Sequence, residues 1–406
     1  MLSSLLLALC TSGATLACAS PASGATYVPD QVIVKYAPGA SPAARRLARR
    51  RGGVIRILGR VRGVDAQVVE VGRDARDAAR QIGASTAVDY AEPDVIMRAT
   101  SVPNDPRFDE LYGIDNPNDA DLDGPEGWDL AFGAGSFPTS PGVRVAIIDT
   151  GIDASHEDLS GRRVACAGVR RFGLVGGLPD PTIVDGRCDD DEDHGTHVAG
   201  TVAATANNGR GVAGVAPPAR LAICKALDAN GSGPVSGIAN CIDWAVGENV
   251  KVISMSLGGA DSTTMEAAVT RAWEDGEGTV VVAAAGNDGT STVSYPAGYA
   301  EVISVAATDA RDRHASFSNA NADVEISAAG VDVLSTRRGG GYLALSGTSM
   351  AAPHVAGVAA VIAFRFPNLD AAGVRDRLTA NADPLGPAGR DPAFGFGRVN
   401  LAEALE

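Results

Sequence analysis

Short apolar runs alternate with segments of helical spacing over most of the chain after residue 140. Apolar runs predict strands at 143–149, 221–226, 250–255, 279–284 and 301–306. Helical spacing predicts helices at 236–246, 264–274, 350–363 and 371–380, and another that begins at His194. Because strands alternate with helices, we predict an α/β fold, a three-layer sandwich in which helices cover both faces of a mostly parallel central sheet.

The first hundred residues follow a different pattern. Strands are predicted at 31–36, 54–58, 66–71 and 87–90, with a basic helix that starts at 41–45 and a second helix at 74–82. Ser41 and Pro42 suit the cap and first turn of the first helix. The order βαββαβ predicts a small α+β, ferredoxin-like domain at 26–100, followed by a larger domain at 101–406.

The extreme N-terminus resembles an export signal. Residues 1–25 carry no charge and contain the apolar run 5–9, followed by small residues. We predict a secretory signal that is cleaved after Ala19 or Ala25, with a lipid on Cys18 as the alternative. No later run is long and apolar enough to span a bilayer, so we expect a secreted protein without a membrane anchor.

Charge is divided unevenly between the two domains. The chain has a net charge of −15, with about +5 on residues 26–100 and about −20 on the remainder. This asymmetry favours attraction between the domains, although surface charge that serves solubility explains it equally well. No basic face indicates nucleic-acid binding.

Four cysteines remain after the signal. An even number in an exported chain favours disulfides over metal ligands. We predict Cys166–Cys188, which closes an inserted loop, and Cys224–Cys241, which ties a strand to the next helix. Each bond would stabilise the fold by about 3 kcal/mol in the chain-entropy model. Four free buried thiols are the alternative.

A serine stands at the start of an apolar helix of small residues. Ser349 follows Ser346-Gly347-Thr348 and precedes the segment 350–363. Unpaired backbone N–H groups and the helix dipole at such an N-terminus stabilise an anion that forms beside the hydroxyl. A serine hydroxyl becomes a strong nucleophile only when a base takes its proton, so a histidine and a carboxylate are required.

Both partners are present in suitable places. Asp149 ends the apolar run 143–149, and open α/β sheets place their sites at the carboxyl ends of buried parallel strands. His194 begins a second helix of small residues. The order Asp149, His194, Ser349, with the run Gly-Thr-Ser-Met-Ala around the serine, resembles the subtilisin-like serine peptidases, the subtilase family.

The resemblance covers nearly the whole chain after residue 25 and implies a catalytic role for each residue. Ser349 is the expected nucleophile, His194 the general base and then acid, and Asp149 the group that orients the imidazole. Asn287 matches the family's oxyanion-hole amide, which donates together with the Ser349 backbone N–H. No cofactor is expected for catalysis.

The resemblance also implies how a peptide is bound. Two chain segments would flank it as an added strand: Gly231, Ser232 and Gly233 on one side, and Ser256, Leu257 and Gly258 on the other. The pocket for the P1 residue, whose carbonyl is attacked, would be lined by Ala284, Ala285 and Gly286, with Ser294 near its base. These small residues predict a preference for large aliphatic or aromatic P1 residues.

Structural calcium is a further implication of the family. The expected ligands are the side chains of Asp105, Asp158 and Asn208, with the carbonyl oxygens of Thr205, Arg210 and Val212. The run 119–124 resembles the opening of an EF-hand loop, but its twelfth position is Leu130, which favours an acidic turn. The run 188–193 is expected to be mostly a solvated acidic loop; cation binding and stabilisation of a charged His194 are the alternatives.

We therefore expect a monomeric, secreted serine endopeptidase that acts on proteins or peptides. Its N-terminal domain resembles the subtilase propeptide, which implies that it acts as an intramolecular inhibitor and is removed by self-cleavage between about residues 97 and 102. The alternative from another class is a catalytically silent, peptide-binding member of the fold. Acyl transfer to an amine instead of water is also compatible with these residues.

Overall fold

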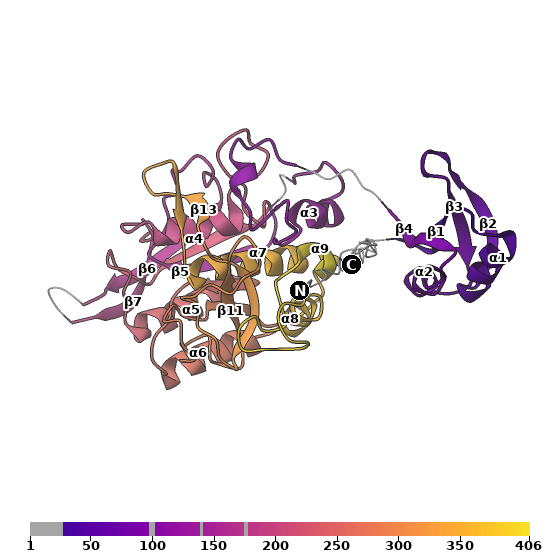
Figure 1. Cartoon of the computed structure of the whole chain (residues 1–406). Helices are drawn as coiled ribbons and strands as arrows, with labels where there is room; N and C mark the ends of the chain where they lie inside the picture. Colours follow the sequence, from indigo (N-terminus) through magenta and orange to yellow (C-terminus); the bar gives the residue numbers. More distant parts are fainter. Residues whose placement is uncertain (1–26, 97–101, 139–140, 174–177) are drawn as a thin grey trace, which may run out of the picture. The chain divides into compact units, whose positions relative to one another are not determined.

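The chain forms two compact units, Met1–Arg98 and Ala99–Glu406. The computed structural model describes residues 27–96, 102–138, 141–173 and 178–406 (Figure 1). The predicted signal, with Cys10 and Cys18, and most of the expected cleavage segment lie outside these described residues.

The smaller unit has the predicted order of elements. They are β1 (Tyr27–Tyr36), α1 (Pro42–Arg51), β2 (Val54–Val61), the 3₁₀ turn η1 (Arg62–Val64), β3 (Ala66–Val71), α2 (Ala75–Gly83) and β4 (Val88–Val95). The strands form an antiparallel sheet in the order β2-β3-β1-β4. Ser41 and Asp74 cap the two helices, as their side chains accept hydrogen bonds from backbone N–H groups of the first turn. Val32, Val69 and Ile82 belong to the core of this unit.

The larger unit is built on one eight-stranded sheet in the order β12-β11-β10-β9-β5-β8-β6-β7 (Figure 1). The strands are β5 (Arg144–Asp149), β6 (Arg163–Arg171), β7 (Asp180–Asp185), β8 (Arg220–Lys225), β9 (Val252–Met255), β10 (Val280–Ala284), β11 (Val302–Thr308) and β12 (Val324–Ala329). All neighbours pair in parallel except β6 and β7. The predicted mostly parallel sheet is confirmed.

Helices cover both faces of this sheet, as predicted. The helices of this unit are α3 (Gly124–Phe132), α4 (His194–Ala203), α5 (Val235–Gly247), α6 (Thr263–Glu274), α7 (Thr348–Arg365), α8 (Ala371–Ala380) and α9 (Leu401–Leu405). Successive β5 residues face opposite layers: Ile147 belongs to the core that includes α4 and α7, and Ile148 to the core that includes α5 and α6. Small residues let α7 pack closely, since a Cβ on Gly357 would lie 2.6 Å from the Val215 Cβ.

Several elements were not predicted from the sequence. The segment 162–193, expected to be an inserted loop, contributes β6 and the antiparallel edge strand β7 to the main sheet. A short hairpin of β13 (Val333–Thr336) and β14 (Tyr342–Leu345) leads into α7. Both regions contain short apolar runs, 164–169 and 342–345, that were not recognised as strands.

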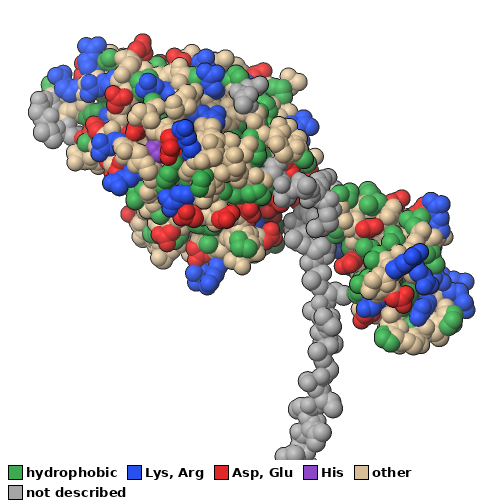
Figure 2. All heavy atoms as spheres, turned by 90° about the horizontal axis from the view of Figure 1, so that it is seen from above, with side chains coloured by type: hydrophobic (Ala, Val, Ile, Leu, Met, Phe, Trp, Pro, Cys, Tyr) green, Lys and Arg blue, Asp and Glu red, His purple; other side chains and the backbone are tan. Residues whose placement is uncertain are grey.

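Both units carry surface charge of both signs. Figure 2 shows basic and acidic side chains on the smaller and on the larger unit. None of the helices within the described ranges combines the length and apolar character that a membrane crossing requires.

Candidate active site

Three polar side chains meet where elements of the larger unit begin or end. Asp149 is the last residue of β5, His194 the first of α4, and Ser349 the second of α7. His194 Nδ1 lies 2.8 Å from Asp149 Oδ1. The Ser349 hydroxyl donates to the Ser256 carbonyl oxygen at 3.2 Å, and His194 and Ser349 line one cavity of about 370 Å³. The histidine thus contacts the aspartate and shares a cavity with the serine.

The surroundings of His194 suit a base. Asp149 is fully buried, and its Oδ1 also accepts the Thr150 backbone N–H at 2.7 Å. Burial alone would lower the pKa of His194, but the charge and hydrogen bond of Asp149, with smaller effects of Glu192 and Asp190, raise it to about 9. In the neutral imidazole, the bond to Asp149 keeps the proton on Nδ1 and leaves Nε2 free to accept one.

Asn287 presents an amide donor to the same cavity. Its Oδ1 accepts hydrogen bonds from the backbone N–H and the hydroxyl of Thr348, at 2.8 and 2.9 Å. Because the oxygen is occupied, the Nδ2 group is the part of the amide that remains for an anion. Asn287, His194 and Ser349 all line this cavity, so the structure brings together the four residues that the sequence singled out.

The sequence predicted that the acidic run 188–193 is mostly a solvated loop. In the structure, part of this run is instead buried and bonded to neighbouring residues. Asp190 is only 8% exposed and accepts hydrogen bonds from the hydroxyls of Thr150 and Thr196, at 2.8 and 2.5 Å. Asp191 forms an ion pair with the buried Lys225, which also donates to the Thr150 carbonyl oxygen. These contacts tie the end of β5 to the start of α4. Sequence reasoning missed them, although a lysine that ends the apolar strand β8 was a usable signal.

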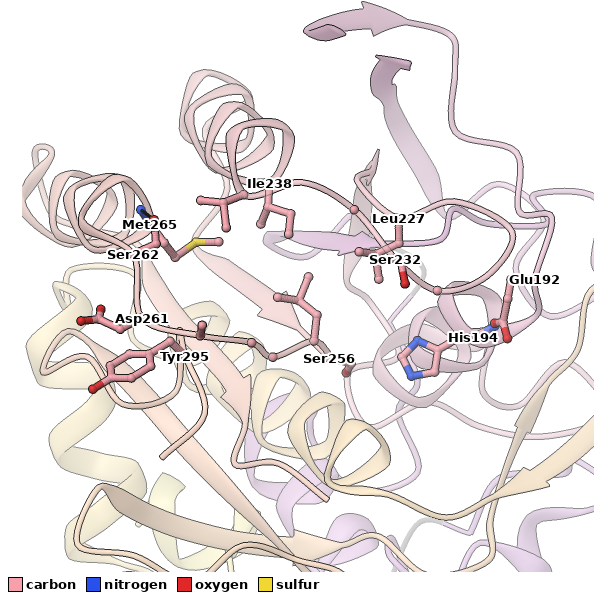
Figure 3. A pocket seen from close by; sticks show the side chains of 17 residues that line it. Glu192, His194, Leu227, Ser232, Ile238, Ser256, Asp261, Ser262, Met265 and Tyr295 are labelled. Atoms are coloured by element: carbon pink, nitrogen blue, oxygen red, sulfur yellow. Dashed lines mark hydrogen bonds between the residues drawn. The ribbon is translucent and has the colours of Figure 1, made fainter. Parts of the chain in front are cut away.

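A second cavity extends from His194 along both predicted substrate edges. It has a volume of about 410 Å³, and Figure 3 shows His194 and Glu192 at one end and Asp261 and Tyr295 at the other. Every residue predicted to flank the peptide lines it: Gly231, Ser232, Gly233, Ser256, Leu257 and Gly258. Leu227, Ile238 and Met265 supply apolar surface between the two ends.

The predicted P1 pocket residues are placed differently. Among the described residues that line the two cavities beside His194, none is Ala284, Ala285, Gly286 or Ser294. Ser294 lies beside the predicted substrate edge 256–258, since a Cβ added to Gly258 would lie 2.2 Å from Ser294 Oγ. Gly286 in turn lies beside Ser294, since a Cβ added to Gly286 would lie 3.2 Å from Ser294 Cβ. Their role in binding P1 stays a prediction.

The side chains expected to bind calcium lie together. Asp105 accepts hydrogen bonds from the backbone N–H groups of Asn207 and Asn208, at 2.6 and 3.0 Å, and the Asn208 amide donates to Asp158 at 2.8 Å. Asp158 also accepts the Val212 N–H at 3.0 Å. Burial, and to a smaller degree the nearby charge of Asp158, raise the pKa of Asp105. Two carboxylates and an amide beside a turn of backbone are oxygen ligands of the kind calcium takes, although within the described ranges no three His, Cys, Asp or Glu residues form a metal-binding group.

The run 119–124 forms an acidic turn. Asp121 accepts the backbone N–H groups of Asn116 and Asp123, at 2.6 and 2.7 Å, and Asp123 accepts the Asn400 amide at 2.7 Å. Burial raises the pKa of Asp121 to about 7. With Leu130 at the twelfth position, where an EF-hand loop has a glutamate, the run is an acidic turn.

Both predicted disulfides are present in the structure. Cys166 bonds to Cys188 and Cys224 to Cys241, with Cα–Cα distances of 5.4 and 5.7 Å, within the usual range.

Comparison with known proteins places the chain in a family. Residues 140–397 match the subtilase family, and residues 14–94 match the fervidolysin N-terminal prodomain. The thermophilic serine proteinase of Bacillus sp. (strain AK1) is 38% identical over 93% of this chain and 88% of its own length. Subtilisin E of Bacillus subtilis (strain 168) is 45% identical over 66% of this chain and 67% of its own.

A solved structure agrees with these relatives. A protease from Pseudoalteromonas arctica PAMC 21717 superposes with a TM-score of 0.64 at 33% identity, covering 75% of this chain and 99% of its own. The chain therefore belongs to the subtilase family and is a serine-type endopeptidase with an N-terminal propeptide.

Proposed function

We propose that the protein hydrolyses peptide bonds through an acyl-enzyme on Ser349. The observation that carries the proposal is the 2.8 Å contact between His194 Nδ1 and Asp149 Oδ1, at a cavity that His194 shares with Ser349. His194 Nε2 takes the hydroxyl proton while Ser349 Oγ attacks the carbonyl carbon. Asn287 Nδ2 and the Ser349 N–H stabilise the oxyanion that forms.

The second half of the reaction reverses the proton transfers. Collapse of the intermediate breaks the C–N bond, and His194 gives its proton to the departing amine. Water then attacks the ester with His194 again as the base, and the acid product leaves. Asp149 holds the imidazole in the required tautomer throughout.

The substrate is proposed to bind as an extended strand between the segments 231–233 and 256–258. Both segments line the 410 Å³ cavity that begins at His194, which suits recognition through the peptide backbone. The P1 side chain is directed towards residues 284–286 and Ser294, and large aliphatic or aromatic residues are preferred there.

Maturation is proposed to occur outside the cell by self-cleavage. The chain cuts itself between about residues 97 and 102, and the propeptide acts as an intramolecular inhibitor whose tail occupies the cleft like a product. The uncharged apolar N-terminus supports export, and two disulfides are typical of an oxidising compartment.

Calcium is proposed to have a structural role, bound by Asp105, Asp158 and Asn208 with carbonyl oxygens of Thr205, Arg210 and Val212. Calorimetric titration should show binding to the wild type and not to Asp158→Asn, and a chelator should lower the melting temperature of the wild type alone. An unchanged melting temperature in chelator would count against the site.

The decisive experiment compares intact mass and N-terminal sequence of wild type, Ser349→Ala and Ser160→Ala, with and without calcium. Ser160 is an exposed serine that lines neither cavity beside His194, and it serves as the matched control. We expect wild type and Ser160→Ala to lose residues up to about 100 and Ser349→Ala to stay intact. Equal cutting of all three would show that another protease matures the chain. No cutting, together with no peptide hydrolysis, would support a silent binding protein.

A further inference from the structure

The residue directly before His194 has a strained backbone. Asp193 has φ 121° and ψ −29°, a conformation that residues with a Cβ rarely adopt and that glycine reaches easily. The Asp193 carbonyl oxygen accepts the His197 N–H at 3.1 Å, so this backbone also fixes where α4 begins. Strain of this kind persists only where the surrounding structure enforces it.

The Asp193 side chain does not cap the helix that it precedes. Among the described residues of the first turn, no backbone N–H donates to this carboxylate, and Glu192 accepts the His194 N–H instead, at 2.7 Å. The two Asp193 oxygens are paired with two arginines: Oδ2 lies 3.6 Å from Arg337 Nε, and Oδ1 lies 3.5 Å from Arg338 Nε. The carboxylate therefore contacts the β13–β14 hairpin and not its own helix.

The hairpin that carries these arginines is itself held in place. Its turn is formed by the glycines 339–341, which all have positive φ. Asp153 accepts a backbone N–H of this turn at 2.8 Å, and His156 Nε2 lies 2.8 Å from a carbonyl oxygen of the turn. The strand β14 then ends at Leu345, shortly before Ser349. The arginines thus lie on a fixed support that continues into the helix of the nucleophile.

We propose that Asp193 is a positioning residue for the catalytic base. Its ion pairs with Arg337 and Arg338 hold the strained backbone, and this backbone orients the imidazole of His194 towards the nucleophile. The proposal rests on the proposed function. Without the ion pairs, residue 193 relaxes and the imidazole moves away from Ser349. A displacement of about 1 Å between reacting groups can lower a rate by about 100-fold, so a small relaxation is enough to affect turnover.

The test compares two substitutions that differ by one carbon atom. Asp193→Ala removes the ion pairs and keeps a Cβ, so the strain remains, whereas Asp193→Gly removes both. A double variant, Arg337→Gln with Arg338→Gln, removes the ion pairs and leaves Asp193 unchanged. Each full-length protein is purified after processing. For one peptide, kcat and KM are measured above the midpoint of that protein's own pH–rate profile, where His194 is neutral.

We expect Asp193→Ala and the double arginine variant to lose kcat by about tenfold, the combined value of two half-exposed ion pairs, with KM little changed. Asp193→Gly should have a kcat about tenfold above that of Asp193→Ala, because glycine adopts the required conformation unaided. Adding Asp193→Ala to the double variant should cause no further loss, because both changes break the same interaction. High salt should lower kcat in the wild type but not in Asp193→Gly.

Arg170→Gln is the matched control. Arg170 Nε lies 3.6 Å from Asp180, and the arginine side chain is 59% exposed, against 54% for Arg337. This ion pair therefore has the geometry and exposure of the pairs under test, but neither residue lines a cavity beside His194. Its removal should leave kcat at the wild-type value.

Three outcomes would overturn the proposal. Equal kcat values in Asp193→Ala and Asp193→Gly show that the ion pairs do not act by holding a strained backbone. An unchanged kcat in the double arginine variant shows that the arginines hold nothing, and this variant decides alone if Asp193→Ala folds poorly. A pH midpoint that rises in the double variant and falls in Asp193→Ala, at constant kcat, shows that these charges act on His194 only electrostatically. Each outcome refutes this proposal alone, whereas failure of the wild type to cut the peptide refutes the proposed function with it.

Discussion

Replacing Asp190 with asparagine tests how the loop before His194 is held to the end of β5. One Asp190 oxygen accepts the Thr150 hydroxyl at 2.8 Å and the Glu192 N–H at 3.0 Å, and the other accepts the N–H and hydroxyl of Thr196 at 2.9 and 2.5 Å. Although burial raises the pKa of Asp190, these donors lower it overall, so the ionised form is the one stabilised. Their stabilisation is present at pH 7 and is lost as the pH falls through the depressed pKa.

The expected loss of stability follows from the hydrogen-bond donors that asparagine would leave without an acceptor. Its amide has one oxygen, so its NH₂ group faces the buried Thr196 N–H, and an unsatisfied buried donor costs about 1–3 kcal/mol. The remaining hydrogen bonds lose their charge assistance, at about 1 kcal/mol. We therefore expect Asp190→Asn to lower the free energy of unfolding by about 3 kcal/mol.

The assay is thermal unfolding in a Ser349→Ala background, which on the proposed mechanism prevents self-digestion and keeps the propeptide in every sample. About 2 °C per kcal/mol is expected for a domain of this size, hence a melting temperature about 6 °C lower. Asp189→Asn is the control, because the Asp189 side chain is 95% exposed and only weakly paired. A transition of Asp190→Asn within about 1 °C of that control would refute the reasoning.

Three further predictions concern activity and stability. In the proposed mechanism His194 must be neutral to act as the base, and its pKa is raised, so kcat/KM should rise with pH around a midpoint above 6.5. Glu192→Gln should lower that midpoint, and a wild-type pH profile centred at or below 6.5 would contradict the assignment. Asn287→Ala should lower kcat by about 100- to 1,000-fold with little change in KM, because removing one oxyanion-hole donor has that cost. Steady-state kinetics that show an unchanged kcat would exclude Asn287 as an oxyanion-hole donor. Replacing Cys224 and Cys241 together should lower the free energy of unfolding by about 3 kcal/mol in the Ser349→Ala background. An unchanged melting temperature would show that this disulfide adds no stability.

The sequence predicted the buried parallel strands well because each is apolar on both faces. The expected range 221–226 and the observed β8 differ by one residue at each end. The strand β12 was missed because polar residues interrupt it: Glu325 is buried against Arg375, and the Ser327 hydroxyl donates to the Gly397 carbonyl oxygen. A polar residue is expected to be exposed until its partner, distant in the chain, is known.

The candidate active site was likewise predicted only where the evidence for a residue lies in its local sequence. Asp149, His194 and Ser349 stood out because each lies in a recognisable local context. The supporting contacts of Asp190 and Lys225 depend on which loops meet in space, and neither residue's own neighbours in the sequence indicate its partner.

The order of strands in the main sheet has a consequence for the cell that makes this protease. Asp149 ends a strand in the middle of the sheet, and Ser349 follows 200 residues later, after β6 to β12 have all been synthesised. A ribosome-bound or truncated chain that stops before α7 contains Asp149 and His194 but lacks Ser349, the proposed nucleophile. In the proposed mechanism such a chain cannot form an acyl-enzyme, so peptidase activity requires that synthesis has passed α7.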